Sequence, residues 1–356
     1  MRNNFISLLC LFASLTVANA QSVQQVNVGD NQNFGITYTL PKTEITVKAK
    51  ATVTKTVAGI YAPYAEKYLG LTDVITTDQT VCELKTITMQ SAAIPDASRT
   101  YHVTFPEKGA LPQFYLTDEG MLLSINRAPE LPAAEPEETE EPEAEKKLTL
   151  KASDVMNEDI LKAGSKAKQA ELTAREIFSI RESRRNLLKG DVDNMPADGA
   201  SFQLVLDNLD AQEQALMSLF VGVSTVTNVE REFKYVPAEN TKNEVLFRFS
   251  SYMGFVDKDD LLGEPYYISV NVIEDNRMDP APVDPKKKAV PQGIAYTVPG
   301  KAGVKLSFEG KTIASTDLQM GQFGHVEQLP ATQFTDKKKL TTASFNPQTG
   351  SIKIYE

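Results

Sequence analysis

Apolar and polar positions alternate with two different periods along this chain, and the change of period divides it into segments. Between residues 165 and 222, apolar side chains recur at the three-and-four spacing of amphipathic helices, which predicts helices over residues 165–188 and 201–220. The first stripe consists of Ala170, Ala174, Ile177, Phe178 and Leu188, widened by Ile180 and Leu187, and the second of Phe202, Val205, Leu206, Leu209, Leu216 and Phe220. Two such helices with a short connection are expected to pack antiparallel, with Phe178 and Leu209 buried between them.

Residues that commonly cap helices stand at the ends of both predicted helices. Ser165 can accept a hydrogen bond from the first turn of the first helix, and Asp198 or Ser201 can do so for the second. Gly190 and Gly222 follow the two apolar stripes, and glycine adopts the left-handed conformation that ends a helix at little cost. The capping pattern therefore supports the same helix limits as the apolar spacing.

On both sides of the helices, the chain shows the alternation of half-buried β-strands. Residues 45–53 alternate most clearly, residues 114–116 and 121–125 flank a glycine turn, and strand-like runs return after Gly222. The predicted fold class is therefore α+β, with β-rich N- and C-terminal units around a central antiparallel helical hairpin.

Two heptads in the β-rich flanks resemble each other. Residues 35–41 and 293–299 match at five of seven positions, and an alternating strand follows each of them. We hypothesise that the two heptads occupy equivalent strand positions in two related β units.

Composition completes the division of the chain. Residues 127–147 hold eight glutamates and several prolines, so this segment cannot bury enough apolar surface to fold and is predicted to be a disordered acidic linker. The predicted segments are a signal peptide (1–20), an N-terminal β-rich unit with a short helix (21–126), the linker (127–147), the helical hairpin plus strands (148–275), a loop (276–292) and a C-terminal β unit (293–356).

The first 20 residues have the three parts of an export signal. Arg2 gives the positive start, residues 5–17 form an apolar run too short to span a membrane, and small residues end at Ala20. The protein is therefore expected to be exported to the periplasm or the cell surface after cleavage following Ala20. No later segment reaches the roughly 18 consecutive apolar residues of a transmembrane helix, so none is predicted.

The net charge of −10 is unevenly distributed. Half of it lies in residues 127–147, where eight glutamates stand against three basic residues. The remaining chain is close to balanced and has no basic surplus, which argues against a nucleic-acid partner.

The residues that usually carry chemistry are sparse. The chain has two histidines, His102 and His325, and the mature chain would keep one cysteine, Cys82, which is predicted to be a buried apolar residue. No nucleophile elbow, phosphate-binding loop or dinucleotide fingerprint is present, so no catalytic residue, metal ligand or cofactor is predicted. The many carboxylates leave open a glycosidase-like pair, although no spacing selects two of them.

Two groups of residues are candidate ligand-binding sites. Arg181 and Arg185 on the first helix could hold an anionic ligand or partner, or could join ion pairs across the hairpin with acidic residues of the second helix. Tyr61, Tyr64 and Tyr68 fall on one face of a short predicted helix, where they could bind a sugar or peptide or could simply pack.

Several blocks of sequence are similar to a known family. Residues 59–70, residues 174–185, the run Phe220-Val221-Gly222 and the later Gln322-Phe323-Gly324 resemble a family of exported proteins of Bacteroides-type Gram-negative bacteria, catalogued as domain of unknown function number 4831. The resemblance implies an envelope location and supplies no reaction.

These observations favour an uncharacterised exported protein that acts as a non-catalytic binding or assembly module of the cell envelope. Its partner would be an unknown envelope protein or a glycan. The alternative is a secreted hydrolase that draws two carboxylates together from distant segments.

Overall fold

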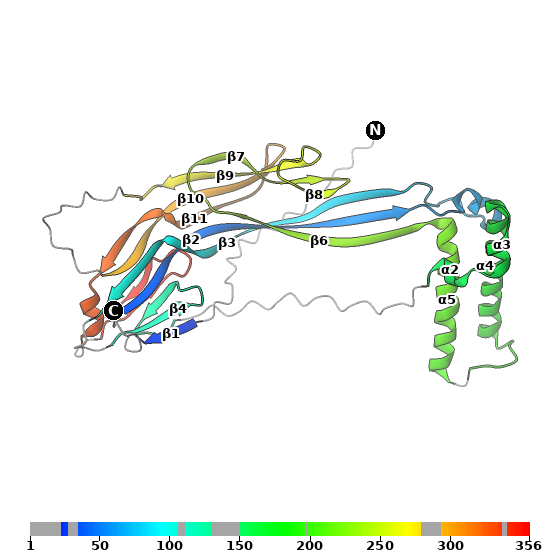
Figure 1. Ribbon diagram of the computed structural model, residues 1–356, viewed down its shortest axis with the longest axis horizontal. Coiled ribbons are helices and arrows are strands. Elements are labelled where there is room, and N and C mark those ends of the chain that lie inside the picture. The colour runs from blue at the N-terminus through cyan, green and yellow to red at the C-terminus, as the bar shows by residue number, and fades with distance from the viewer. Residues whose placement is uncertain are drawn as a thin grey trace.

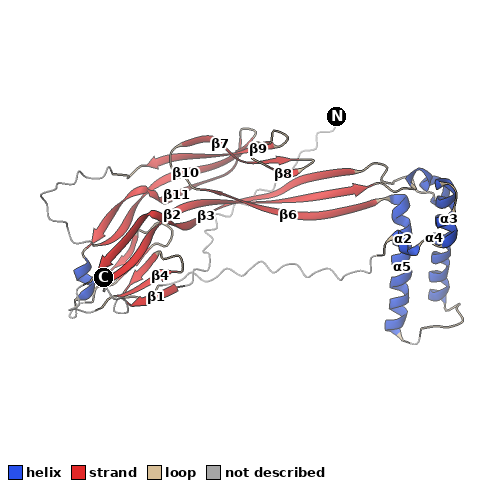
Figure 2. Ribbon diagram, viewed as in Figure 1, coloured by secondary structure: helices blue, strands red, loops and turns tan. Residues whose placement is uncertain are grey.

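The computed structural model describes residues 23–27, 35–105, 111–129, 150–196, 198–278, 293–336 and 340–356. The molecule is elongated: a β-rich body lies at one end, a long three-stranded arm leaves it, and all the α-helices gather at the far end of the arm (Figures 1 and 2). We call this group of helices the head. The predicted signal peptide and most of the predicted linker and loop lie outside the described residues.

Three long antiparallel strands form the frame of the molecule, which we call sheet B. Its order is β3-β2-β6, with β2 in the centre. The strands are β2 (Gly35–Val57), β3 (Gln79–Thr104) and β6 (Val223–Tyr235). β2 is one continuous strand of 23 residues that passes from the body through the whole arm. The alternation over residues 45–53 predicts only part of it.

Two five-stranded antiparallel sheets complete the body. Sheet A has the order β1-β4-β5-β12-β13 and sheet C the order β11-β10-β9-β7-β8. Sheet A consists of β1 (Val23–Asn27), β4 (Gln113–Thr117), β5 (Leu122–Ile125), β12 (Ala343–Phe345) and β13 (Ile352–Tyr355). Sheet C consists of β7 (Thr241–Ser250), β8 (Gly254–Val256), β9 (Glu264–Glu274), β10 (Ile294–Phe308) and β11 (Lys311–Leu329). The hairpin predicted around the glycine turn is present as β4–β5.

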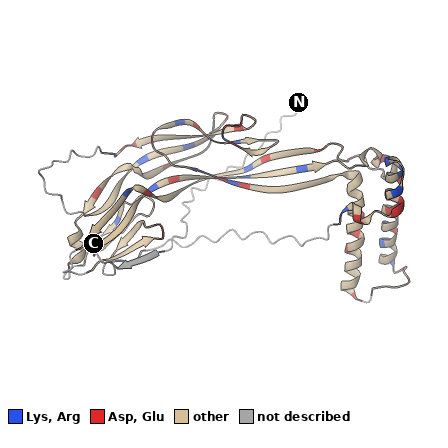
Figure 3. Cartoon of the chain, viewed as in Figure 1, with Lys and Arg blue, Asp and Glu red and all other residues tan. Residues whose placement is uncertain are grey.

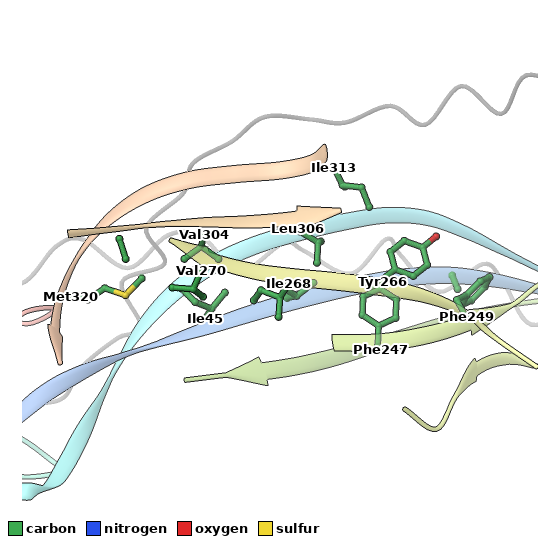
Figure 4. Close-up of a cluster of buried hydrophobic side chains, with 14 of the residues drawn as sticks. Ile45, Phe247, Phe249, Tyr266, Ile268, Val270, Val304, Leu306, Ile313 and Met320 are labelled. Atoms are coloured by element: carbon green, nitrogen blue, oxygen red, sulfur yellow. The ribbon is translucent and has the colours of Figure 1, made fainter. Parts of the chain in front are cut away.

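The largest hydrophobic core lies between sheets B and C (Figure 4). Alternate residues of β2 from Ile45 to Ala51 face the inner side chains of sheet C, and Cys82 is buried beside them as predicted. Four aromatic rings from four strands form a stack with successive centroid separations of 4.4, 4.5 and 4.4 Å. The rings belong to Phe233, Phe247, Tyr266 and Phe308. This core ends near Cys82, whose backbone N–H donates to Ser251 O at 2.7 Å.

The two similar heptads do occupy equivalent positions. The first heptad begins β2, which forms a hairpin with β3, and the second begins β10, which forms a hairpin with β11. The register shifts in the same way in both hairpins, from Thr39↔Thr100 to Pro41↔Pro95 and from Val298↔His325 to Gly300↔Met320. In each hairpin the shift advances two residues on the first strand and five on its partner, so the two heptads occupy equivalent strand positions.

The head is built from short helices and one helical hairpin. α4 (Lys166–Lys189) and α5 (Gly199–Val221) are the two predicted helices, with Ser165 and Asp198 as their N-caps and Gly190 and Gly222 after their last turns. Smaller helices surround them: η2 (Ala62–Tyr64), α1 (Ala65–Leu69), α2 (Ala152–Val155) and α3 (Glu158–Lys162). One further short helix, η3 (Ala331–Thr335), lies in the body.

The predicted fold class is wrong. The helices are not the centre around which two β units are mounted, because they project from the far end of the arm and three antiparallel sheets dominate the fold (Figure 2). The reason lies in long-range pairing. β2 and β6 pair over 13 residues although the whole head separates them in sequence, and sheet A combines strands from both ends of the chain. The strands therefore build the frame, and the head is inserted into it.

The predicted burial of Phe178 is also wrong. Its side chain is 50% exposed, whereas Ile177 and Ile180 next to it are buried. Leu209 is half-buried against the core of the head. The apolar stripe of α4 is wider than the surface that α5 covers, so the edge of the stripe that includes Phe178 remains in solvent.

Buried tyrosines predict a loss of stability at alkaline pH. Burial raises the pKa of Tyr38 above its ordinary value and raises the pKa of Tyr266 to about 12. Both hydroxyls ionise near pH 10 once the chain unfolds, so the unfolded state loses protons first. The free energy of unfolding should be constant with respect to these groups below about pH 10 and should fall as pH rises toward about 12. Urea denaturation curves measured at several pH values check this, and an unchanged midpoint up to pH 12 would contradict it.

Candidate functional site

The base of the head is fixed to the arm by backbone hydrogen bonds. Tyr61 N–H donates to Leu219 O at 2.7 Å, and Ile75 N–H donates to Val221 O at 3.0 Å. Both acceptors belong to the last turn of α5, so the segment that follows β2 and the helix that precedes β6 are joined side by side. This junction sets the direction in which α4 and α5 leave the arm (Figure 1).

The three predicted tyrosines lie at this base, and they are not equally accessible. Tyr61 is buried, its ring packs against that of Phe220 at a centroid distance of 5.4 Å, and its hydroxyl lies 3.5 Å from Gln169 Oε1. Burial also raises the pKa of Tyr61. Tyr64 and Tyr68 are half-buried against the same cluster, with ring centroids 6.3 Å apart. Because Tyr61 is buried by packing, only Tyr64 and Tyr68 of this group are accessible to a ligand. A ligand-binding role for the three tyrosines stays a prediction.

Arginines of α4 pair with carboxylates of α5 across the hairpin. Arg181 Nε lies 2.6 Å from Glu213 Oε1, and Arg184 Nη2 lies 2.9 Å from Glu213 Oε2. Arg184 also pairs with Asp210. The Glu213 side chain is only 12% exposed, so two guanidinium groups compensate one largely buried carboxylate. Arg181 is therefore engaged in an ion pair within the protein. The sequence pattern does not select Arg184, although Arg184 forms two of these three ion pairs.

Arg185 differs from its two neighbours. Its side chain is exposed and forms no ion pair with any residue that the structure describes. It shares one face of α4 with Phe178, Arg181 and Leu188, which follow the spacing i, i+3, i+7 and i+10. Phe178 and Leu188 are 50% and 62% exposed, and the Arg181 guanidinium lies 5.8 Å from the Phe178 ring centroid. We call these four residues the α4 stripe.

The family model described as a domain of unknown function, DUF4831, matches residues 34–353. The chain belongs to this family. No curated protein and no solved structure matches this chain. The matched range includes β2, the arm, the head and sheet C, so the head of this DUF4831 protein is part of the family domain.

Charge is distributed unequally within the DUF4831 head. Figure 3 shows acidic and basic residues along α4, whereas α5 is mostly uncharged. The described parts of the chain contain no group of three or more histidine, cysteine or acidic residues that could hold a metal ion. Within the same residues, no helix combines the length and the hydropathy needed to cross a membrane.

Proposed function

We propose that this protein is an exported binding or assembly protein of the cell envelope, and that its head binds a helix of another envelope protein through the α4 stripe. The observation that supports the proposal most directly is the exposure of Phe178 and Leu188 on either side of Arg185. Aromatic and arginine side chains carry a large share of the binding energy at protein interfaces.

The chemistry of the α4 stripe defines the partner. An amphipathic partner helix could place apolar side chains against Phe178 and Leu188 and a carboxylate against Arg185, which has no ion pair among the described residues. Arg181 is held by Glu213 and packs near Phe178, so it fixes one side of the binding surface without itself needing a partner charge. The arm supports the proposal, because it holds this surface far from the body (Figure 1).

The envelope location rests on the N-terminal sequence. Residues 1–20 have the pattern of a cleaved export signal, and the mature protein would begin at Gln21 in the periplasm or at the cell surface. Fractionation of native cells followed by N-terminal sequencing tests this part. Recovery of uncleaved protein from the cytoplasm would contradict the proposed export.

Site-specific photocrosslinking in intact native cells tests the partner. Leu188 on the α4 stripe and Leu204 on α5 are both 62% exposed, which makes Leu204 a matched control. A photoreactive amino acid at position 188 should give a discrete crosslinked product, and the same group at position 204 should not. Adding Arg185→Glu should lower the yield at position 188 about tenfold, as loss of about 1.4 kcal/mol of binding energy predicts.

The same experiment can contradict the proposal. Equal products from positions 188 and 204 would indicate nonspecific contact. A product at position 188 that is insensitive to Arg185→Glu would show that the stripe does not recognise an acidic partner. Because Arg185 is exposed and unpaired in the described protein, the substitution should leave the thermal midpoint of unfolding unchanged.

A further inference from the structure

β6 is an edge strand whose outer side has no partner in the described protein. Sheet B has the order β3-β2-β6, so β6 pairs only with β2. The half of β6 nearest the head, from Val223 to Val229, lies mostly in solvent, and Val226 is 62% exposed. We call residues 223–229 the β6 edge.

The direction of the backbone groups along β2 follows from two contacts. Thr43 N–H donates to Gln322 Oε1, and Gln322 Nε2 donates to Thr43 O, both at 2.9 Å, so both groups of Thr43 point away from β3. Gln322 Nε2 also lies 3.3 Å from Pro237 O, just beyond the end of β6, which places this contact on the β6 side of β2. The backbone N–H and C=O groups of successive residues point to opposite sides of a strand. From Thr43 onward, every second residue of β2 therefore directs these groups toward β6.

The same alternation gives the outward groups of the β6 edge. The register Val53↔Thr227 joins two residues that point toward each other, so Ser224, Val226 and Asn228 direct their N–H and C=O groups outward. Cys82 provides an independent check: it faces Val53 in β3, and its N–H leaves the sheet to reach Ser251 O at 2.7 Å, as the alternation requires.

The β6 edge lacks the features by which proteins usually protect an edge strand. It contains no proline and no charged residue, and its pairing with β2 runs over all 13 residues of β6 without a bulge. Figure 3 shows the contrast with the body half of the same strand, which is charged. On the opposite edge, β3 carries Glu83 and Lys85, and the loop at Ser251 covers Cys82 N–H.

We propose that the β6 edge binds an extended strand of another protein by adding it to sheet B. The partner segment would be uncharged and rich in β-branched residues, because the edge consists only of valine, serine, threonine and asparagine and offers no charge to match. A second copy of this chain is a poor occupant. In Figure 1, α5 leaves the end of the arm on the side of β6, so a long strand running past Val223 would meet α5.

Hydrogen exchange measured residue by residue with a defined peptide tests this proposal. The probe is the capped, uncharged heptapeptide Ala-Thr-Val-Thr-Thr-Thr-Val, which copies residues 51–57, the part of β2 that pairs with residues 223–229, with threonine in place of Lys55. Without peptide, the amides of Ser224, Val226 and Asn228 should exchange much faster than those of Thr225 and Thr227. With peptide, the three fast amides should slow at least about tenfold, whereas the two slow ones should not change.

Matched variants separate the backbone from the side chain. Val226→Pro removes the central outward N–H without removing a bond to β2, since proline is tolerated where a strand N–H faces solvent. It should keep the thermal midpoint and lose the peptide effect at Ser224 and Asn228. Val226→Thr keeps the N–H and should retain the effect. The same peptide methylated on every backbone nitrogen should have no effect on the unaltered protein.

Three results would overturn the proposal. The first is slow exchange of all three outward amides without peptide, since the edge would then already be occupied. The second is no protection with peptide on the order of 1 mM, which excludes even weak strand addition. The third is equal protection by the methylated peptide. Because the methylated peptide leaves the protein unaltered, the test holds even if Val226→Pro fails to fold.

Discussion

Phe247→Ala is expected to lower the free energy of unfolding by about 3–5 kcal/mol. Phe247 is 1% exposed and occupies an inner position of the aromatic stack, between Phe233 of sheet B and Tyr266 of sheet C. Removing the ring leaves a cavity and also ends the contact between rings from the two sheets. The loss should therefore affect the whole body, because this core joins its two main layers.

Chemical denaturation followed by circular dichroism measures this effect. Phe178→Ala is the matched control, since it removes the same ring from a position that is 50% exposed, and it should cost less than about 1 kcal/mol. If both variants lose the same stability, the core between sheets B and C does not hold the body together as described.

Gly59→Val is expected to detach the head from the arm while the body stays folded. A Cβ at position 59 would lie 2.6 Å from both Leu219 O and Phe220 O, which is closer than nonbonded atoms approach. The clash falls on backbone atoms that cannot rotate away, so the junction must open. We expect a cost of about 3 kcal/mol or more, confined to the head.

Hydrogen exchange distinguishes this local effect from general unfolding. Amides of α4 and α5 should exchange at least about tenfold faster in Gly59→Val, whereas amides of β10 and β11 should keep their rates. Gly164→Ala is the control, because a Cβ there meets nothing within 4 Å. Faster exchange throughout the body would contradict the idea that the head opens as a separate unit.

The local features of the head could be predicted from the sequence. The three-and-four spacing, the caps at Ser165 and Asp198 and the stop at Gly190 place α4 and α5 within two residues of their limits in the structure. These signals are local, because a cap needs only the first turn and a stripe needs only one helix. The same spacing could not distinguish Ile177, which is buried, from Phe178, which is not, since that depends on how far α5 covers α4.

The architecture could not be predicted in the same way. Pairing of β2 with β6 depends on contacts across the entire head, and an alternating pattern identifies a strand without identifying its neighbour. The sequence leaves two possibilities for Arg181, an anionic ligand or an ion pair across the hairpin, and only the geometry shows that Arg181 and Arg184 both pair with Glu213. Arg185 is left unpaired by the same geometry, and the outward amides of the β6 edge have no sequence signal at all.

The position of the head between β2 and β6 has a consequence for the order of folding. During synthesis from the N-terminus, β2 is complete long before β6, yet β2 is the central strand of the frame and requires β6 on one side. The helices between them make local contacts, which form fast, whereas sheet closure across a long intervening segment is slow. The newly made chain should therefore pass through a stage in which the helices are formed and the central strand is paired with β3 on one side but has no neighbour on the other. That strand is then open to pairing errors, and folding helpers that bind extended chain would act most usefully on it before β6 arrives.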